Sequence, residues 1–426
     1  MPDLDLRTHL VDDVVGWWLR HGPDDLQGGV FTCWDNAGER LLSTDKYTWS
    51  QGRWIWLTAR LADSVARGAL ASAQDRLDSE RLLALARSTA DFVRRHALLP
   101  DGTTAYVTDR TGRPKEPAPG AGLHTSVFAD CFVALGLAAL ARLDGDRAAA
   151  RLAEDLLHSA DARVRAGRAR TDPYPVHPAF AAFSLPMILL GTATEVHQAT
   201  GSPGSAEVAT QAARTIVTWF RDGADVRELR PNPRGFDDTL LARHRTPGHV
   251  LECAWFLVHA ADTVPGVAGV LGDWPTWLPT VAAHALALGW DEQDGGLFRY
   301  TDVDGGEPRG RLLDDPYERL VRDTWDTKLW WPHAEALYAT ALLARRCRAA
   351  DRSAPAAELT AWHDRLRAYT FATFPAGPGR EWIQIRRRDG APLDQTVALP
   401  VKDPFHVARA LLLMVEIDEP GERTNP

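Results

Sequence analysis

The stretch RTPGHVLECAWFLV, residues 245–258, shows how this chain builds a helix and what the helix carries at its start. Thr246 is a typical N-cap residue, and Pro247 and Gly248 suit a first helical turn, where an N–H group has no intrahelical partner. Apolar residues then recur at intervals of three and four, which predicts a helix with a buried face. The same pattern recurs along most of the chain.

Helical periodicity is found in segments that are fairly evenly spaced along the sequence. They are Leu4–Leu19, Trp49–Arg67, Asp78–His96, Thr125–Leu143, Arg147–Ala166, Phe183–His197, Ser205–Phe220, His249–Ala261, Trp277–Leu288, Pro332–Cys347, Ala357–Phe374 and His406–Val415. About twelve helices without a low-complexity linker predict an all-α fold, an (α/α)6 barrel whose inner helices line a cavity. An open helical solenoid is the alternative, but it usually shows a sequence repeat, and we find none. We therefore expect one catalytic domain over residues 1–426.

Alternating strand patterns are few and lie between the helices. The segments GGVFTCWDNAGERLL (28–42) and GGLFRYTDVDG (295–305) predict short β-hairpins around turns. Long loops at one rim of the barrel are expected to build the site. They are Gly22–Asp45, Pro100–His124, Asp222–Thr246, Asp291–Asp315 and Pro375–Val401.

Composition narrows the class of protein. The 426 residues carry a net charge of −9, which argues against a nucleic-acid partner. The chain has four scattered cysteines without a CxxC pair, an acidic start without a signal peptide, and no apolar stretch long enough to cross a membrane. We therefore expect a cytoplasmic protein. Sixteen tryptophans favour a carbohydrate site, because indole rings stack on sugars, although they also fill cores.

Several common catalytic signatures are missing from the sequence. It contains no GxxxxGK[ST] phosphate loop, no HExxH zinc helix and no GxSxG nucleophile elbow. The segment DVDGGEP lacks the ligand spacing of a calcium loop and is better explained as a hairpin turn. We therefore expect no metal.

Two residues of the opening stretch are candidates for chemistry. His249 falls in the first helical turn, and Glu252 lies one turn later on the same face. The positive end of the helix dipole disfavours imidazolium, so His249 is expected to be neutral and available as a base. A structural histidine near a helix start is an equally good explanation of the spacing alone.

A second histidine has a similar context in VKDPFHVARALLL, residues 401–413. His406 follows a loop that contains a proline and leads into an apolar helix, with Arg409 one turn on. Taken alone this pattern favours a structural role. Two histidines at helix starts in an α-barrel can nevertheless meet across one cavity.

Two further segments combine aromatic and charged residues. In TKLWWPHAEALYATALL, Trp330 and Trp331 precede a helix with Glu335 in its first turn, which suits a sugar held by stacking and hydrogen bonds. A core tryptophan pair with a capping glutamate is the alternative. In STDKYTWSQGRWIWLTARL, Arg53 is placed to polarise a substrate oxygen, or else to close the barrel rim through an ion pair.

Taken together, these segments resemble the N-acylglucosamine 2-epimerase family. The resemblance covers residues from about 28 to 413 in the family's order. The matching stretches are GGVFTCWDNAG, DKYTWSQGRWIW, SLPMILLGTATEV, TPGHVLECAWFLV, WDEQDGGLFRYTDVDG, KLWWPHAEAL and FHVARALL. The resemblance implies an (α/α)6 barrel and a sugar epimerase or isomerase that acts on a monosaccharide.

The resemblance also implies roles for individual residues. His249 and His406 match the two acid/base histidines, Glu252 and Glu335 match carboxylates that orient them or bind hydroxyls, and Arg53 matches the arginine that faces the carbonyl oxygen. The expected substrate contacts are Trp331, Trp330, Trp49, Arg409 and Met187. Other branches carry an additional histidine near Met187, and His177 is a weak substitute for it.

The implied chemistry leaves several questions open. Deprotonation at C2 followed by reprotonation from the opposite face makes a 2-epimerase of the N-acylglucosamine or glucose/mannose type. Reprotonation at C1 makes an aldose–ketose isomerase of the mannose/fructose or sulfoquinovose type, and Thr246 stands where the isomerase branch has threonine. A glycoside hydrolase and a non-catalytic binding protein are less favoured. No cofactor is required, and the sequence leaves open a nucleotide effector and a homodimer.

Overall fold

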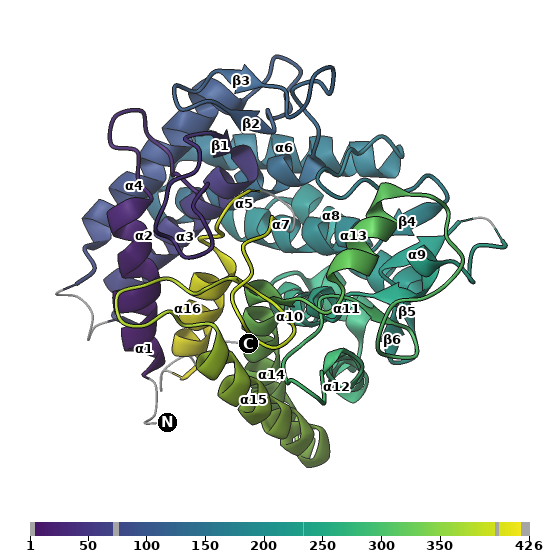
Figure 1. Ribbon diagram of the computed structural model, residues 1–426. Coiled ribbons are helices and arrows are strands. Elements are labelled where there is room, and N and C mark those ends of the chain that lie inside the picture. Colours follow the sequence, from purple (N-terminus) through teal and green to yellow (C-terminus); the bar gives the residue numbers. More distant parts are fainter. Residues whose placement is uncertain (1–4, 71–75, 233, 397–399, 419–426) are drawn as a thin grey trace.

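Six long helices pack side by side into a closed ring in the computed structural model, which describes residues 5–70, 76–232, 234–396 and 400–418. Around the ring they are α3 (Thr48–Ala66), α5 (Val127–Asp144), α7 (Ser184–Thr200), α10 (Pro247–Thr263), α14 (Trp330–Ala349) and α16 (His406–Asp418). Helix α16 packs against α3 and so closes the ring (Figure 1).

A second layer of helices covers the ring from outside (Figure 1). Its helices are α1 (Leu6–Thr8), α2 (Gly16–His21), α4 (Ser79–Phe92), α6 (Arg147–Arg165), α8 (Pro203–Thr215), α11 (Pro265–Leu271), α12 (Leu278–Gly289) and α15 (Ser353–Thr373). π-helical turns η1 (His9–Val15), η3 (Val93–Ala97) and η4 (Ile216–Phe220) and the 3-10 turn η5 (Trp274–Thr276) extend this layer. The prediction of an (α/α)6 barrel is confirmed.

Inner and outer helices differ in how they are buried. Helix α5 is buried on every side over most of its length. Helix α6 buries one face, because its other face meets solvent. The buried residues are Ala149, Ala153, Leu156, Leu157, Ala160 and Asp161. Intervals of three and four on one face are those of a helix that covers a core. In the described chain no helix is long and apolar enough to span a membrane.

Short strands and two small helices connect the long helices at the rim. The helices are α9 (Leu240–Arg243) and α13 (Pro316–Thr324). The strands are β1 (Lys46–Tyr47), β2 (Val107–Thr108), β3 (Pro114–Lys115), β4 (Phe180–Ala182), β5 (Arg221–Asp222), β6 (Asp225–Val226), β7 (Leu229–Pro231), β8 (His244–Arg245), β9 (Thr301–Asp302), β10 (Lys328–Leu329) and β11 (Ile385–Arg386).

The two predicted hairpins differ in how their strands pair. In residues 28–42, Trp34 and Leu41 form an antiparallel bridge around a turn. In residues 295–305 the strand β9 pairs with β8 instead of within its own segment. The partner of this strand is more than fifty residues away in the sequence, so local alternation could not reveal it.

A short structural unit occurs twice at the rim, although no sequence repeat was expected. The segments DDLQGGVF (24–31) and DEQDGGLF (291–298) fold into the same turn. In the first unit the ammonium of Lys46 donates to Asp24, and in the second that of Lys328 donates to Asp291, each at 3.0 Å. Both lysines lie in the strand just before an inner helix, so each clamp fixes the position of a helix start.

The helices α3 and α5 approach each other closely at two glycines. A Cβ atom added to Gly52 would lie 2.3 Å from the carbonyl oxygen of Phe132, and one added to Gly136 would lie 2.3 Å from that of Gly52. Both obstacles are backbone atoms that cannot rotate away. The two helices therefore depend on these glycines for their spacing.

We expect Gly52→Ala to lower the free energy of unfolding by about 1–3 kcal/mol, because the methyl group forces the helices apart. Urea unfolding followed by circular dichroism measures the change. Gly269→Ala in α11 is the control, since among the described residues no atom beyond its chain neighbours and its own helix backbone lies within 4 Å of the added Cβ. It should raise stability by about 0.5–1 kcal/mol. Equal stability of the two variants would contradict the close packing.

Candidate active site

One cavity lies at the rim where all six inner helices begin. Each helix contributes a residue from its first two turns to the wall. They are Arg53 of α3, Phe128 of α5, Met187 of α7, His249 of α10, Trp331 of α14 and His406 of α16. The N-terminal ends of helices carry partial positive charge, so this mouth favours a ligand that develops negative charge.

Four inner helices carry charged residues at the same spacing, which we call the common register. A buried basic residue precedes each helix, and the seventh residue after it is again charged. The pairs are Lys46 with Arg53, Arg245 with Glu252, Lys328 with Glu335 and Lys402 with Arg409. His249 and His406 are both the fourth residue in this register. Positions four and seven lie on one helix face, so each histidine lies beside a charged side chain.

His249 is held by a glutamate that comes from another part of the chain. Its Nδ1 lies 3.0 Å from Oε2 of Glu228, whose side chain is buried, while 25% of the His249 side chain stays exposed. Burial acts to lower the pKa of His249, but the Glu228 carboxylate outweighs it and raises the pKa above the usual value. The expectation of a neutral histidine at the helix dipole was therefore wrong in direction. A full negative charge in contact outweighs the partial charge of a helix end.

Glu228 was not predicted from the sequence. It precedes β7 in the loop 222–246, which was expected to form part of the rim. Its distance of 21 residues from His249 has no helical period, so no local pattern links the two. Only the pairing of β7 with β4 brings the carboxylate to the cavity wall.

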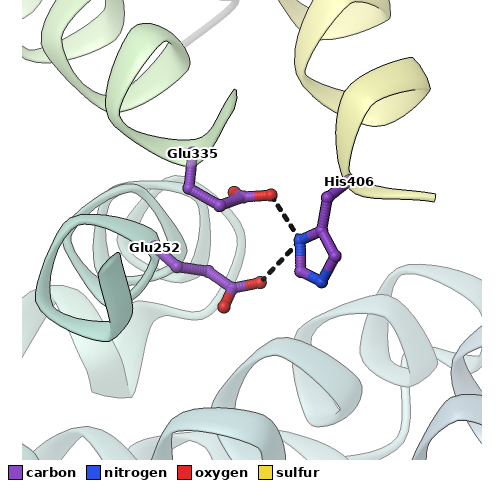
Figure 2. Close-up of side chains that lie close together, drawn as sticks. All are labelled: Glu252, Glu335 and His406. Atoms are coloured by element: carbon purple, nitrogen blue, oxygen red, sulfur yellow. Dashed lines mark hydrogen bonds and ion pairs between the residues drawn. The ribbon is translucent and has the colours of Figure 1, made fainter. Parts of the chain in front are cut away.

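His406 is held by two carboxylates from neighbouring helices. Its Nδ1 lies 2.7 Å from Oε1 of Glu335 and 3.9 Å from Oε1 of Glu252. Figure 2 shows both carboxylates on one side of the ring and the Nε2 atom turned away from them. With Nδ1 engaged, Nε2 is the atom left to exchange a proton with a ligand.

Arg409 neutralises these two carboxylates. Its Nη2 lies 2.5 Å from Glu252 and 2.7 Å from Glu335. Burial alone would raise the pKa of Glu335, but Arg409 and His406 outweigh it and hold the value at about 2. Arg409 does not line the cavity, so the expected sugar contact is corrected to a supporting role behind the wall. Glu335 also lies behind the wall, where it accepts a hydrogen bond from Trp255.

Glu252, Glu335 and His406 lie close enough together to hold a metal ion, because one ligand atom of each lies within 4.8 Å of the others. The guanidinium of Arg409 already brings a positive charge to both carboxylates. The expected pairing of Glu252 with His249 is also replaced, since Glu252 turns toward Arg409 and His406. The cluster is better described as an internal ion network than as a set of metal ligands.

Asp403 organises the cavity wall next to His406. Its carboxylate accepts from Nη1 of Arg53 at 3.0 Å, from the indole N–H of Trp330 at 3.1 Å and from the backbone N–H of His406 at 2.8 Å. Burial acts to raise the pKa of Asp403, but His406 and Arg53 outweigh it and hold the pKa below its usual value. Asp403 lies in the histidine motif at residues 401–413, but the motif alone predicted no role for it.

The aromatic residues divide into contact and support positions. The ring of Trp331 lies 5.1 Å from that of His249 and 6.0 Å from that of His406, so it lies beside both. Trp330 also lines the cavity, yet its N–H is bound to Asp403. Trp49 lines it too and packs under the guanidinium of Arg53. His177 packs on Phe180 and is absent from the described cavity wall.

The sequence profile of N-acylglucosamine 2-epimerase (GlcNAc 2-epimerase) matches residues 29–410. The chain belongs to the N-acylglucosamine 2-epimerase family. The enzyme of that name from Bos taurus is 29% identical, over 96% of this chain and 89% of its own. That from Homo sapiens is 28% identical, over 96% of this chain and 88% of its own. The prediction that the chain is a sugar 2-epimerase, and so an isomerase, is confirmed.

Solved structures share the fold of this family member. A sugar epimerase from a ruminal bacterium is similar with a TM-score of 0.76 at 15% identity, over 97% of this chain and 98% of its own. The cellobiose 2-epimerase of Bacillus thermoamylovorans follows with a TM-score of 0.72 at 15% identity, over the same shares. A D-mannose isomerase has a TM-score of 0.71 at 16% identity, over 98% of this chain and 100% of its own.

We expect Glu228→Gln to lower the pKa of His249, because the neutral amide no longer stabilises imidazolium while burial still opposes it. Imidazole NMR signals titrated with pH, with His249→Asn used to assign the resonance, measure the change. Glu207→Gln, an exposed substitution on α8, should leave the titration where it is. An unchanged or higher pKa in Glu228→Gln would contradict the pairing.

Arg409→Met should destabilise the fold by about 3–5 kcal/mol, because two buried carboxylates lose their counter-charge. Chemical denaturation gives the change in free energy of unfolding. The matched control is Arg352→Met, which breaks an exposed pair with Asp273 and should cost less than about 1 kcal/mol. Similar losses in the two variants would show that the network contributes little.

Proposed function

We propose that this sugar 2-epimerase interconverts N-acylglucosamine and N-acylmannosamine, with His249 and His406 as its acid/base pair. The single observation that carries the assignment is the paired arrangement of the two imidazoles. Both line one cavity, each has its Nδ1 against a buried carboxylate, and both lie beside the ring of Trp331. The N-acyl sugars are proposed from the names of the curated relatives.

The proposed reaction begins with the open-chain aldehyde, whose C2–H is weakly acidic. Nε2 of one histidine removes this proton, and the electron pair moves through C1 to the aldehyde oxygen. The Arg53 guanidinium, oriented by Asp403, stabilises the resulting negative charge. The second histidine then returns a proton to C2 from the opposite face, the electron pair re-forms the aldehyde, and the configuration at C2 is inverted.

This scheme needs one protonated and one neutral histidine at the start of each turnover. The contact with Glu228 raises the pKa of His249 and so favours its protonated form. We therefore assign His249 as the proton donor in one direction and as the base in the other. His406 has the opposite role in each direction. The carboxylates hold the tautomers in which Nδ1 carries a proton and Nε2 serves the substrate.

A hydrolase mechanism has less support from the same cavity. It needs two carboxyl groups that reach the glycosidic bond and its water. Glu335 lies behind the cavity wall, and both Glu335 and Glu252 are bound to Arg409. These contacts suit carboxylates that orient other groups.

We also propose that the chain is a single catalytic domain located in the cytoplasm. The closure of the ring by α16 against α3 supports one domain. The four cysteines are free thiols, all buried, which suits a reducing compartment.

Incubation of the enzyme with N-acetylmannosamine in D2O, followed by NMR, tests the proposal. We expect N-acetylglucosamine with deuterium at C2. Deuterium at C1 of a new ketose would instead identify an aldose–ketose isomerase. Mannose and glucose, run in parallel, test the other 2-epimerase type. A lack of turnover with N-acetyl sugars, combined with turnover of mannose, would overturn the substrate assignment.

Each histidine should be needed for epimerisation. We expect His249→Asn and His406→Asn each to reduce it by roughly 10²–10⁴-fold. Each variant should retain C2 proton exchange in only one of the two epimers, because the remaining base reaches only one face. His158→Asn, on the outer helix α6, should behave as the wild type. Full epimerisation by either catalytic variant would reject the pair.

A further inference from the structure

A second arginine lines the cavity on the side of His249. Arg299 is buried and lies two residues before β9, which pairs antiparallel with β8. Strand β8 ends just before α10, the helix that begins with Pro247 and carries His249. The strand pairing therefore places Arg299 beside the start of that helix. Arg53 lies elsewhere, bound to Asp403 next to His406.

The guanidinium of Arg299 is held in a defined orientation. Its Nη1 donates to the hydroxyl of Thr324 at 3.0 Å, and its Nη2 reaches the hydroxyl of Tyr174 at 3.4 Å. Its central carbon lies 4.8 Å from the centre of the Tyr300 ring. A guanidinium has five N–H groups, so it can keep such contacts and still donate to a ligand. Tyr174 lines the same cavity and adds a hydroxyl beside it.

Apolar residues also line the cavity near these two. Pro175 and Val176 follow Tyr174 in the chain, and Val176 and Leu229 belong to one apolar cluster with Tyr300. A pocket with a few fixed donors in an apolar wall suits a small group that has one acceptor oxygen and an alkyl end. An acyl group has this composition, because its carbonyl oxygen accepts hydrogen bonds and its alkyl carbon is apolar.

We infer that Arg299 and Tyr174 bind the carbonyl oxygen of the acyl group on C2 of the substrate, and that the apolar wall takes up its alkyl end. The inference rests on the proposed function, in which C2 of the substrate lies between the two histidines. Arg299 lies on the side of His249, and Arg53 lies next to His406. Arg53 stabilises charge at O1, whereas Arg299 is a specificity-determining residue that recognises the acyl substituent at C2. A hydrogen bond from a charged donor to a buried acceptor accounts for a preference of roughly 10- to 100-fold.

The test compares N-acetylmannosamine with mannose in the wild type, Arg299→Met and Tyr174→Phe. We expect Arg299→Met to lower kcat/KM for N-acetylmannosamine by roughly 10- to 100-fold and Tyr174→Phe to lower it less. Values for mannose should stay within about threefold, since mannose has no acyl group. If mannose is not turned over, its inhibition constant against N-acetylmannosamine replaces kcat/KM.

Two controls separate specificity from damage to the fold. Arg309→Met removes an exposed arginine from the same rim segment and should change neither sugar. Arg299→Lys keeps a charge without the planar fork, so it should recover only part of the preference. An equal fall with both sugars in Arg299→Met and Tyr174→Phe would indicate a structural role and overturn the inference.

The outcomes also distinguish this inference from the function on which it rests. Lack of wild-type turnover of N-acetylmannosamine overturns the proposed substrate. Normal wild-type turnover with an unchanged sugar preference in both variants overturns only the acyl site.

Mannuronate, with a carboxylate at C6, is the last comparison. If Arg299→Met weakens mannuronate binding and spares N-acetylmannosamine, the arginine reads a carboxylate and the acyl assignment is wrong.

Discussion

The buried ion network around Arg409 is the constraint on which the rest of the site depends. One guanidinium from α16 balances Glu252 of α10 and Glu335 of α14, so three inner helices are joined at one point. Without this cation the two carboxylates would repel each other, and burial would favour their neutral forms. With it, Glu335 stays ionised and orients His406 on the same helix as Arg409. The linkage of three inner helices and the orientation of one candidate acid/base group thus use the same ion network.

The barrel contributes more than a scaffold, because all six inner helices begin at the cavity. Their N-terminal ends direct partial positive charge toward a substrate that becomes negatively charged during reaction. The lysine clamps at Asp24 and Asp291 hold two of these helix starts in place. Since the fourth and seventh residues after a buried cation point the same way, one repeated register supplies both histidines and the charges beside them.

The two histidines differ in the origin of their partners. Glu335, which holds His406, is carried by an inner helix, whereas Glu228, which holds His249, comes from a rim loop. Arg299 also comes from a rim segment and lies on the side of His249. This division places the common chemistry on the helices and leaves the loops to adjust one histidine and the substrate. Loop substitutions therefore offer a way to alter substrate preference while the residues on the helices are kept.

The sequence by itself determined the long helices and the residues at their starts, because periodicity and capping depend on neighbours within one or two turns. It did not predict the short helices α9, α11 and α13. The helix starts offered His249, His406, Glu252 and Arg53 as candidates, the family resemblance implied their roles, and the structure places all four at the cavity. Only the tertiary structure decided which charges meet. Three of these pairs are far apart in the sequence. The separation is 21 residues for Glu228 and His249, 350 for Arg53 and Asp403, and 157 for Glu252 and Arg409. Such contacts raise the pKa of His249 and hold Arg409 behind the cavity wall, because electrostatic energy depends on distance in space and on burial.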